Sequence, residues 1–77
     1  MAREQKSADV VAEMVANVLK VVVAPGDLLE AGDTVVLLES MKMEIPVLVE
    51  TAGTVAAVKV SEGDVVQEGD VLVTMDL

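Results

Sequence analysis

The stretch Glu39-Ser40-Met41-Lys42-Met43-Glu44-Ile45-Pro46 lies at the middle of the chain and sets one lysine between two methionines. The segments on its two sides are copies of each other. A shift of 37 residues lays Val10–Ser40 over Val47–Leu77 without a gap, and ten of the 31 aligned positions are identical. The identical pairs are Val10/Val47, Glu13/Glu50, Val18/Val55, Val21/Val58, Val23/Val60, Gly26/Gly63, Asp27/Asp64, Gly32/Gly69, Asp33/Asp70 and Val36/Val73. Between the two copies only residues 41–46 are left over, so Lys42 lies at the junction of the repeat.

The composition favours one small all-β domain. A chain of 77 residues forms a single domain that buries roughly 60% of the surface exposed by its unfolded chain. The chain has no Phe, Tyr or Trp, and its hydrophobic fraction of 53% is mostly Val, Leu, Ala and Met. Valine favours strands because its branched side chain packs well on a pleated surface. The absence of cysteine excludes disulfides and thiolate metal sites.

Charge and residue types also exclude several classes of function. A net charge of −9 with five basic residues repels phosphate backbones, so we expect no nucleic-acid partner. We find neither a signal-peptide core near the N-terminus nor an apolar run of bilayer length, and we therefore expect a cytoplasmic protein without a membrane partner. The lack of His, Cys and Tyr removes the usual general bases and the best nucleophile. We expect no catalytic residues, a non-catalytic protein and a monomer when isolated.

The first 23 residues allow two interpretations. Residues 1–9 are polar and predict a disordered tail ahead of a domain that spans residues 10–77. The apolar positions of Val10–Leu19 also fit one face of a helix, with Ser7 or Asp9 as a cap. The second copy decides between helix and strand, because Val47–Val60 follows a proline, contains Gly53 and has the pattern strand, turn, strand. By analogy we predict strands over residues 10–14 and 18–23.

Each copy contains two Gly-Asp turns, at Gly26-Asp27 and Gly32-Asp33 and at Gly63-Asp64 and Gly69-Asp70. Glycine adopts positive φ freely and aspartate bonds to nearby backbone, so turn formation explains these pairs. Calcium binding is the alternative, but the dense carboxylate spacing of known calcium loops is missing. We therefore expect no metal site. Short strands are predicted between the turns, at Leu28-Leu29 and Val65-Val66, and after them, at 35–38 and 72–75.

About four short strands in each half predict a sandwich or flattened barrel. One half alone would leave an apolar face in water, whereas two halves related by a twofold axis cover each other. The strand that ends near Ser40 should pair with the one that begins near Ile45. Applying the 37-residue shift, the strand that ends at Leu77 should pair with the one that begins at Val10. The two termini should then be neighbours, at the end of the molecule opposite Lys42.

The turn at the centre is unusual for a hairpin. Tight two-residue turns favour Asn-Gly, Asp-Gly or a second glycine, whereas residues 40–43 contain none of these. Local rules tend to be broken at functional positions, and flexible thioethers at a polar tip are an uncommon exposure of apolar surface. The plain alternative is that Lys42 only aids solubility while Met41 and Met43 belong to the core. The position of Lys42 at the repeat centre favours a functional role.

The segment Glu39–Pro46 resembles the attachment motif of biotinyl domains, also called biotin carboxyl carrier domains. The resemblance covers residues 10–77, includes the Gly-Asp turns and Ala52-Gly53-Thr54-Val55, and is greatest to short bacterial biotin/lipoyl attachment proteins. It implies a flattened β-barrel of two four-stranded antiparallel sheets with quasi-twofold symmetry, the barrel-sandwich hybrid type. Some members insert a "thumb" before the lysine. The gap-free match of the two copies leaves no room for one, so we expect none.

The resemblance also implies roles for individual residues. Lys42 matches the lysine that a biotin protein ligase acylates, and Met41 and Met43 match the methionines associated with biotin as the cofactor. Glu39, Ser40 and Glu44 lie beside them and are candidates for ligase recognition. Gly53 matches a small turn residue that faces the lysine hairpin.

The implied function is that of a carrier. An exposed lysine ammonium is mostly protonated at neutral pH and is a poor nucleophile, so a separate ligase must modify it. The biotin on Lys42 would carry carboxylate between the biotin carboxylase and carboxyltransferase sites of a biotin-dependent carboxylase, with acyl-CoA or pyruvate as acceptors. Tethering makes each delivery intramolecular. The alternative within the fold is a lipoyl carrier on the same lysine in an acyl-transfer complex, against which the two methionines argue.

Overall fold

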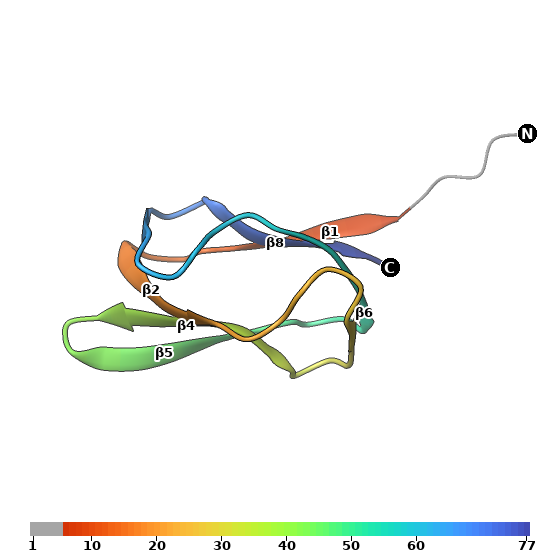
Figure 1. Ribbon diagram of the computed structural model, residues 1–77, viewed down its shortest axis with the longest axis horizontal. Coiled ribbons are helices and arrows are strands. Elements are labelled where there is room, and N and C mark those ends of the chain that lie inside the picture. The colour runs from red at the N-terminus through yellow and green to blue at the C-terminus, as the bar shows by residue number, and fades with distance from the viewer. Residues whose placement is uncertain (1–5) are drawn as a thin grey trace, which may run out of the picture.

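The computed structural model describes residues 6–77, which fold into eight strands (Figure 1). These strands are β1 (Ser7–Val11), β2 (Ala16–Val21), β3 (Leu28–Leu29), β4 (Thr34–Ser40), β5 (Met43–Leu48), β6 (Gly53–Val58), β7 (Val65–Val66) and β8 (Val71–Asp76). No helix in this part of the chain is long and apolar enough to cross a membrane. The all-β prediction is confirmed, and the strand interpretation of residues 10–23 is correct in type.

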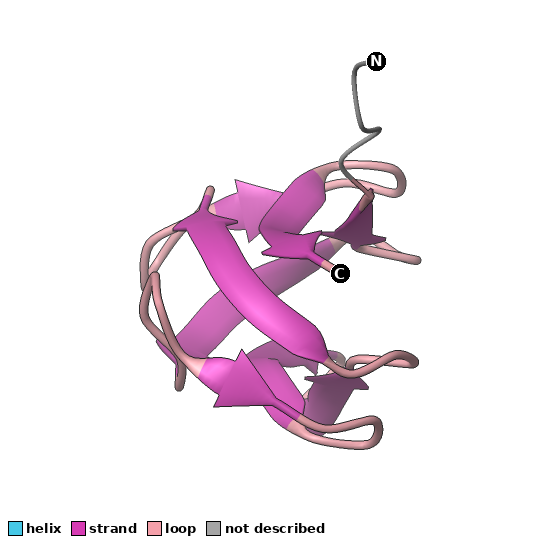
Figure 2. Ribbon diagram, turned by 90° about the vertical axis from the view of Figure 1, so that its right-hand side faces the viewer, coloured by secondary structure: helices cyan, strands magenta, loops and turns pink. Residues whose placement is uncertain are grey.

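The strands form two four-stranded antiparallel sheets. Sheet A has the order β1-β8-β6-β3, and sheet B has the order β5-β4-β2-β7. The 37-residue shift relates the two sheets strand by strand. In the order of sheet A, the corresponding pairs are β1 and β5, β8 and β4, β6 and β2, and β3 and β7. Each sheet therefore contains two strands from each half, and neither half forms a sheet of its own. Figure 2 shows these strands as two layers that enclose the interior.

The symmetry extends to individual contacts. β2 bulges against β4 between Val18 and Lys20, and β6 bulges against β8 at the equivalent place, between Val55 and Ala57. All four Gly-Asp turns have a glycine at φ of 93° to 95°. In each turn the aspartate Oδ2 accepts a hydrogen bond of 2.8–2.9 Å from the backbone N–H three residues earlier, on Ala24, Glu30, Ser61 or Gln67. These bonds confirm the turn interpretation of the Gly-Asp pairs.

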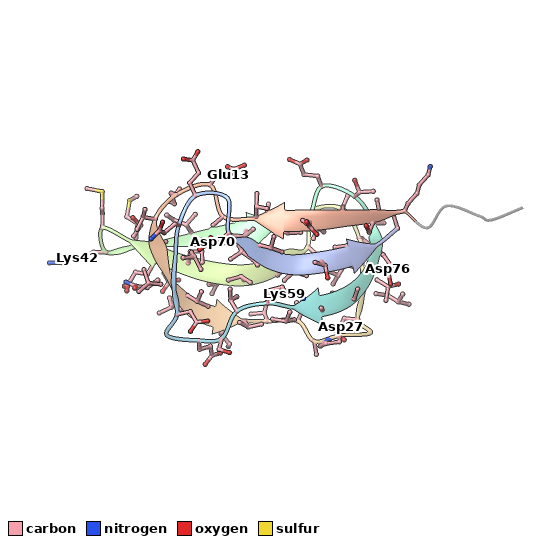
Figure 3. All side chains as sticks on the ribbon, turned by 90° about the horizontal axis from the view of Figure 1, so that it is seen from above. Glu13, Asp27, Lys42, Lys59, Asp70 and Asp76 are labelled. Carbon is pink, nitrogen blue, oxygen red and sulfur yellow. The ribbon has the colours of Figure 1, made fainter. Side chains whose placement is uncertain are left out.

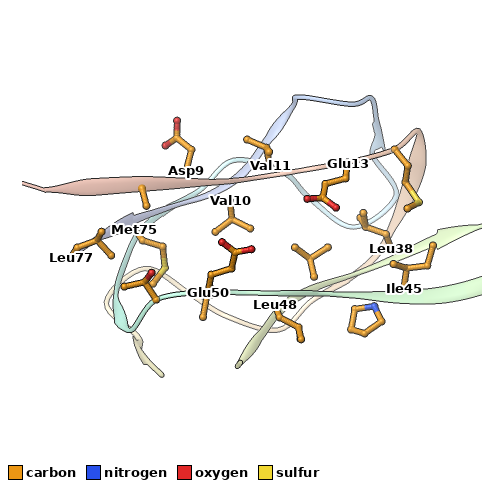
Figure 4. Close-up of a pocket in the computed structure, with 16 residues that line it drawn as sticks. Asp9, Val10, Val11, Glu13, Leu38, Ile45, Leu48, Glu50, Met75 and Leu77 are labelled. Atoms are coloured by element: carbon orange, nitrogen blue, oxygen red, sulfur yellow. The ribbon is translucent and has the colours of Figure 1, made fainter. Parts of the chain in front are cut away.

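The core lies between the sheets and is aliphatic. Its largest fully buried side chains are Leu38, Leu72, Met75, Val35, Val36, Val55, Val66 and Val73. Within residues 6–77 no polar or charged side chain is buried. The sandwich opens along one side, where the edge strands β1 and β5 border a groove of about 380 Å³ (Figure 4). The twofold axis relates the two walls of this groove, since Val10 and Glu13 lie on one and Val47 and Glu50 on the other.

The two ends of the described chain, Lys6 and Leu77, lie together at one end of the barrel, as the repeat predicts. β1 pairs with β8 from Ser7 opposite Asp76 to Val10 opposite Val73. The β4–β5 hairpin lies at the other end of the molecule (Figure 1).

The predicted start of the first strand is wrong. β1 begins at Ser7 instead of Val10, so Ser7–Asp9 belong to sheet A and are not part of a disordered tail. Ser7 and Asp9 are exposed while Ala8 and Val10 are half-buried, the alternation expected of a strand with one face on the core. Residues 1–5 of the predicted tail lie outside the described residues.

Candidate functional site

The β4–β5 hairpin closes with a two-residue turn. Ser40 lies opposite Met43, so only Met41 and Lys42 form the loop. Both have positive φ, 53° for Met41 and 65° for Lys42, as a type I′ turn requires. They are the only non-glycine residues with positive φ among the described residues. An L-residue with a Cβ is strained in this conformation, and such strain clusters at functional sites.

The turn presents its side chains to solvent. Met41 is 89% exposed and Met43 is 59% exposed. Lys42 is exposed as well and projects from the end of the molecule opposite the termini (Figure 3). The alternative in which the two methionines belong to the core is therefore wrong, whereas Met75 illustrates a core methionine at 2% exposure. The hairpin holds one primary amine at its apex with a thioether on each side.

Two of the predicted recognition residues form a like-charged pair. Glu39 on β4 lies directly opposite Glu44 on β5. Directly opposite residues share one face of a sheet, and like charges in that arrangement destabilise it. Ser40 is half-buried at the end of β4, next to the turn. The structure thus brings all six predicted site residues together on one hairpin.

A shallow hollow of about 290 Å³ lies beside the turn. Met41 and Lys42 line it from the turn, and Glu39 and Ser40 from β4. The other lining residues are Val15, which precedes β2, Ala16 and Asn17 of β2, and Val65 of β7. These residues of β2, β7 and the segment before β2 were not predicted to be part of the site. Asn17 gave a signal, since it is a polar residue between the buried Ala16 and Val18 and so must face outward. Val65 gave none, because a two-residue strand carries no information on its register.

The predicted place of Gly53 is wrong. A Cβ built on Gly53 would lie 2.6 Å from the backbone oxygen of Asp76 and 3.1 Å from Leu77, so this glycine lies beside the C-terminal end of β8. Lys42 is at the opposite end of the molecule (Figure 3). The twofold axis explains the exchange, because the counterpart of Gly53 is Ala16, which does line the hollow beside Lys42.

Comparison with known families identifies the fold. The sequence profile of the biotin/lipoyl family, described as "biotin-requiring enzyme", matches residues 4–75. The chain belongs to this family. The segment Glu39–Pro46 with Lys42 and all eight strands except the last residue of β8, Asp76, lie within the matched range.

Several relatives cover part of the chain. It is 72% identical over 40 residues to the biotinylated protein TB7.3 of Mycobacterium bovis, a match that covers 52% of this chain and 56% of the relative. It is 66% identical over 44 residues to the TB7.3 homolog of Mycobacterium leprae, covering 57% and 62%. It is 50% identical over 38 residues to the biotin/lipoyl attachment protein of Bacillus subtilis, covering 49% and 52%. The alignments thus span about half of these proteins.

Solved structures match almost the whole chain. The Kluyveromyces lactis urea carboxylase has a TM-score of 0.86 and 31% identity over 97% of this chain, which corresponds to 7% of the carboxylase. A single-chain, multi-domain long-chain acyl-CoA carboxylase has a TM-score of 0.84 and 30% identity over 97% of this chain and 8% of its own. The barrel of two related sheets is therefore shared with a small part of each of these large enzymes.

Proposed function

We propose that Lys42 is the residue on which this protein carries biotin, and that the protein is a non-catalytic carrier for a biotin-dependent carboxylase. The observation that carries the proposal is the hairpin itself. A strained two-residue turn places one exposed amine between two exposed thioethers, at the centre of the repeat and at one end of the barrel. A lysine that served only solubility would not need a turn conformation that glycine and asparagine adopt more easily.

The residues present fit covalent attachment of biotin. Amide formation needs an amine that another protein can reach, and Lys42 is exposed at the apex of the hairpin (Figure 3). Loss of a proton from the Lys42 ammonium frees the lone pair of Nζ, which attacks the activated carboxyl carbon of biotin. An amide bond forms and the activating group leaves.

The barrel has no catalytic part in this proposal. Bound biotin supplies a ureido nitrogen that takes up and releases a carboxyl group at the active sites of the carboxylase. The rigid sheets hold Lys42 away from the body of the domain, so the arm reaches a biotin carboxylase site and a carboxyltransferase site in turn. A tether raises the effective concentration of the carried group above that of a freely diffusing one. Acyl-CoA and pyruvate are the proposed classes of acceptor.

Intact-mass measurement tests the proposal. The purified protein is incubated with a biotin protein ligase, biotin and ATP, and the expected result is the addition of one biotinyl group. Lys42→Arg keeps the positive charge and should remain unmodified. Lys59→Arg, a change at an exposed lysine on the body of the barrel, is the matched control and should be modified like the wild type. Biotin on the Lys42→Arg variant would overturn the assignment.

A second incubation, with a lipoate ligase, lipoate and ATP, decides between the two cofactors of the family. The exposed methionines on both sides of Lys42 favour biotin. Lipoylation of the wild type together with failure of biotinylation would replace the proposed function by that of a lipoyl carrier on the same residue.

A further inference from the structure

Four residues form a continuous row across the outer face of sheet B, next to the hairpin turn. Glu44 on β5 lies opposite Glu39 on β4, Glu39 lies opposite Asn17 on β2, and Asn17 lies opposite Val65 on β7. Directly opposite residues point to the same side of a sheet. The neighbours of this row along the strands, Leu38, Val18 and Val66, are each 2% exposed and face the core. The row therefore faces solvent, and we call these four residues the outer row.

The outer row combines two carboxylates with exposed apolar surface. Val65 is 66% exposed, and Val15, which precedes β2, is 63% exposed. Both valines line the hollow of about 290 Å³ to which Lys42 and Met41 also contribute. An apolar surface that is continuous with the modified residue and is bordered by carboxylates has the composition of a protein-binding surface.

We propose that the biotin protein ligase docks on this outer face of sheet B, with an apolar side chain against Val65 and Val15 and a basic group opposite Glu39 and Glu44. The proposal rests on the proposed function, in which a ligase must bring its active site onto Lys42. The hairpin that carries Lys42 is continuous with sheet B alone, since sheet A contains neither β4 nor β5. An enzyme that contacts the domain while it reaches Nζ meets the outer row directly beneath the turn. Val65 and Asn17 are thereby recognition residues outside the hairpin.

The fold supplies a matched control at its other end. The twofold-related row on sheet A consists of Ser7, Asp76, Thr54 and Leu28, each opposite the next. Leu28 corresponds to Val65 and is 82% exposed. Leu28 and Val65 are each the first residue of a two-residue strand at the edge of its sheet. We therefore expect a lysine substitution to disturb the barrel to a similar degree at either site, but only Val65 lies beside Lys42.

The test compares Val65→Lys with Leu28→Lys in steady-state loading by ligase, biotin and ATP. Val65→Lys replaces an apolar contact by a charge that repels a basic group, and we expect kcat/KM to fall about tenfold or more, mainly through KM. Leu28→Lys should stay within about twofold of the wild type. Equal midpoints of urea unfolding show that both variants are folded. Equal loading of the two variants would overturn the docking proposal.

A second measurement does not depend on substitution. Unlabelled ligase is added to isotope-labelled apo protein and amide resonances are followed by NMR. We expect shifts or broadening at Asn17 and Val65 together with the hairpin, and none at Thr54 and Leu28. Perturbation confined to sheet A would contradict the proposal. Failure of the wild type to be loaded would instead count against the proposed function, so the two failures are distinguishable.

Discussion

The backbone N–H of Leu77 donates a hydrogen bond of 3.0 Å to the carbonyl oxygen of Lys6. The 37-residue shift relates this pair to Ser40 and Met43, which flank the turn at the other end of the barrel. Lys6 and Leu77 therefore occupy positions equivalent to those that flank the turn of the β4–β5 hairpin at the other end of the barrel. The two ends of the barrel are thus equivalent: Ser40 and Met43 are joined by a turn at one end, whereas Leu77 and Lys6 are joined only by a hydrogen bond at the other.

Closing that end should stabilise the protein. Residues 6–77 are joined head to tail through Asn-Gly, the dipeptide that type I′ turns favour. Cross-linking the ends of a long chain reduces the entropy of the unfolded state, and we expect the free energy of unfolding to rise by about 2–4 kcal/mol. Urea denaturation measures it, with the linear chain of identical composition as control. An unchanged midpoint would mean that the ends are not held as the structure shows them.

The same relationship shows why the predicted strand boundary was wrong. Identity between the copies begins at Val10, and the polar residues Ser7 and Asp9 obscure the strand that precedes it. The shift relates Met43, the first residue of β5, to Lys6, so the start of β5 in the structure accounts for the early start of β1. Gly53 was misplaced for a similar reason. Its position was inferred from resemblance, whereas the shift pairs it with Ala16 and sends it to the terminal end.

Other parts of the fold could be predicted because their sequence patterns lie within short segments or are repeated in the second copy. Alternating valines, Gly-Asp turns and a single break in the repeat predicted the strands, the twofold axis and the exposed hairpin. The neighbours across β2 and β7 could not be predicted in this way. Their register depends on two residues, Val65 and Val66, whose pairing with β2 is fixed only when the whole barrel closes. Contacts between strands far apart in sequence are where sequence patterns carry least information.

Replacing Met41-Lys42 by Asn-Gly should stabilise the protein. Met41 and Lys42 have φ of 53° and 65°, and replacing them by Asn-Gly puts residues that adopt this left-handed region readily in their place. We expect the free energy of unfolding to rise by about 1–2 kcal/mol and biotin loading to be lost. The control is Met43→Asn, which changes a neighbouring strand residue and should bring no gain in stability. If Asn-Gly lowers stability, the turn is not strained.

Gly53→Ala should destabilise the fold without touching the lysine site. The new Cβ would lie 2.6 Å from the backbone oxygen of Asp76, and overpacking of this kind costs about 1–3 kcal/mol. Thermal unfolding measures the loss, and the initial rate of biotin loading below the transition should be unchanged. Gly63→Ala is the comparison, since its Cβ meets nothing within 4 Å but its φ is +93°. The loss of stability in Gly63→Ala measures backbone strain alone, whereas the loss in Gly53→Ala measures the steric clash of the new Cβ.

The Gly-Asp turns should depend on the acceptor oxygen and not on charge. Asp27 accepts a hydrogen bond of 2.9 Å from the N–H of Ala24 through Oδ2. Asp27→Ala removes this bond and should lower the free energy of unfolding by about 1 kcal/mol. Asp27→Asn keeps an acceptor and should have little effect. Asp64, the twofold counterpart, should respond in the same way. A large loss in the asparagine variant would point to a role for the carboxylate charge.

Glu44→Gln should improve stability and impair modification at the same time. Glu44 and Glu39 face each other across β4 and β5, and removal of one charge from such a pair should stabilise the sheet by about 0.2–1 kcal/mol. The same change removes half of the charge that the proposed ligase contact uses, so kcat/KM for biotin loading should fall at low ionic strength and converge with the wild type as salt screens the contact. Glu30→Gln, a change at an exposed residue in the turn between β3 and β4, controls for net charge. If Glu44→Gln and Glu30→Gln have the same kcat/KM for biotin loading at every salt concentration, the Glu39–Glu44 pair does not contribute to ligase binding.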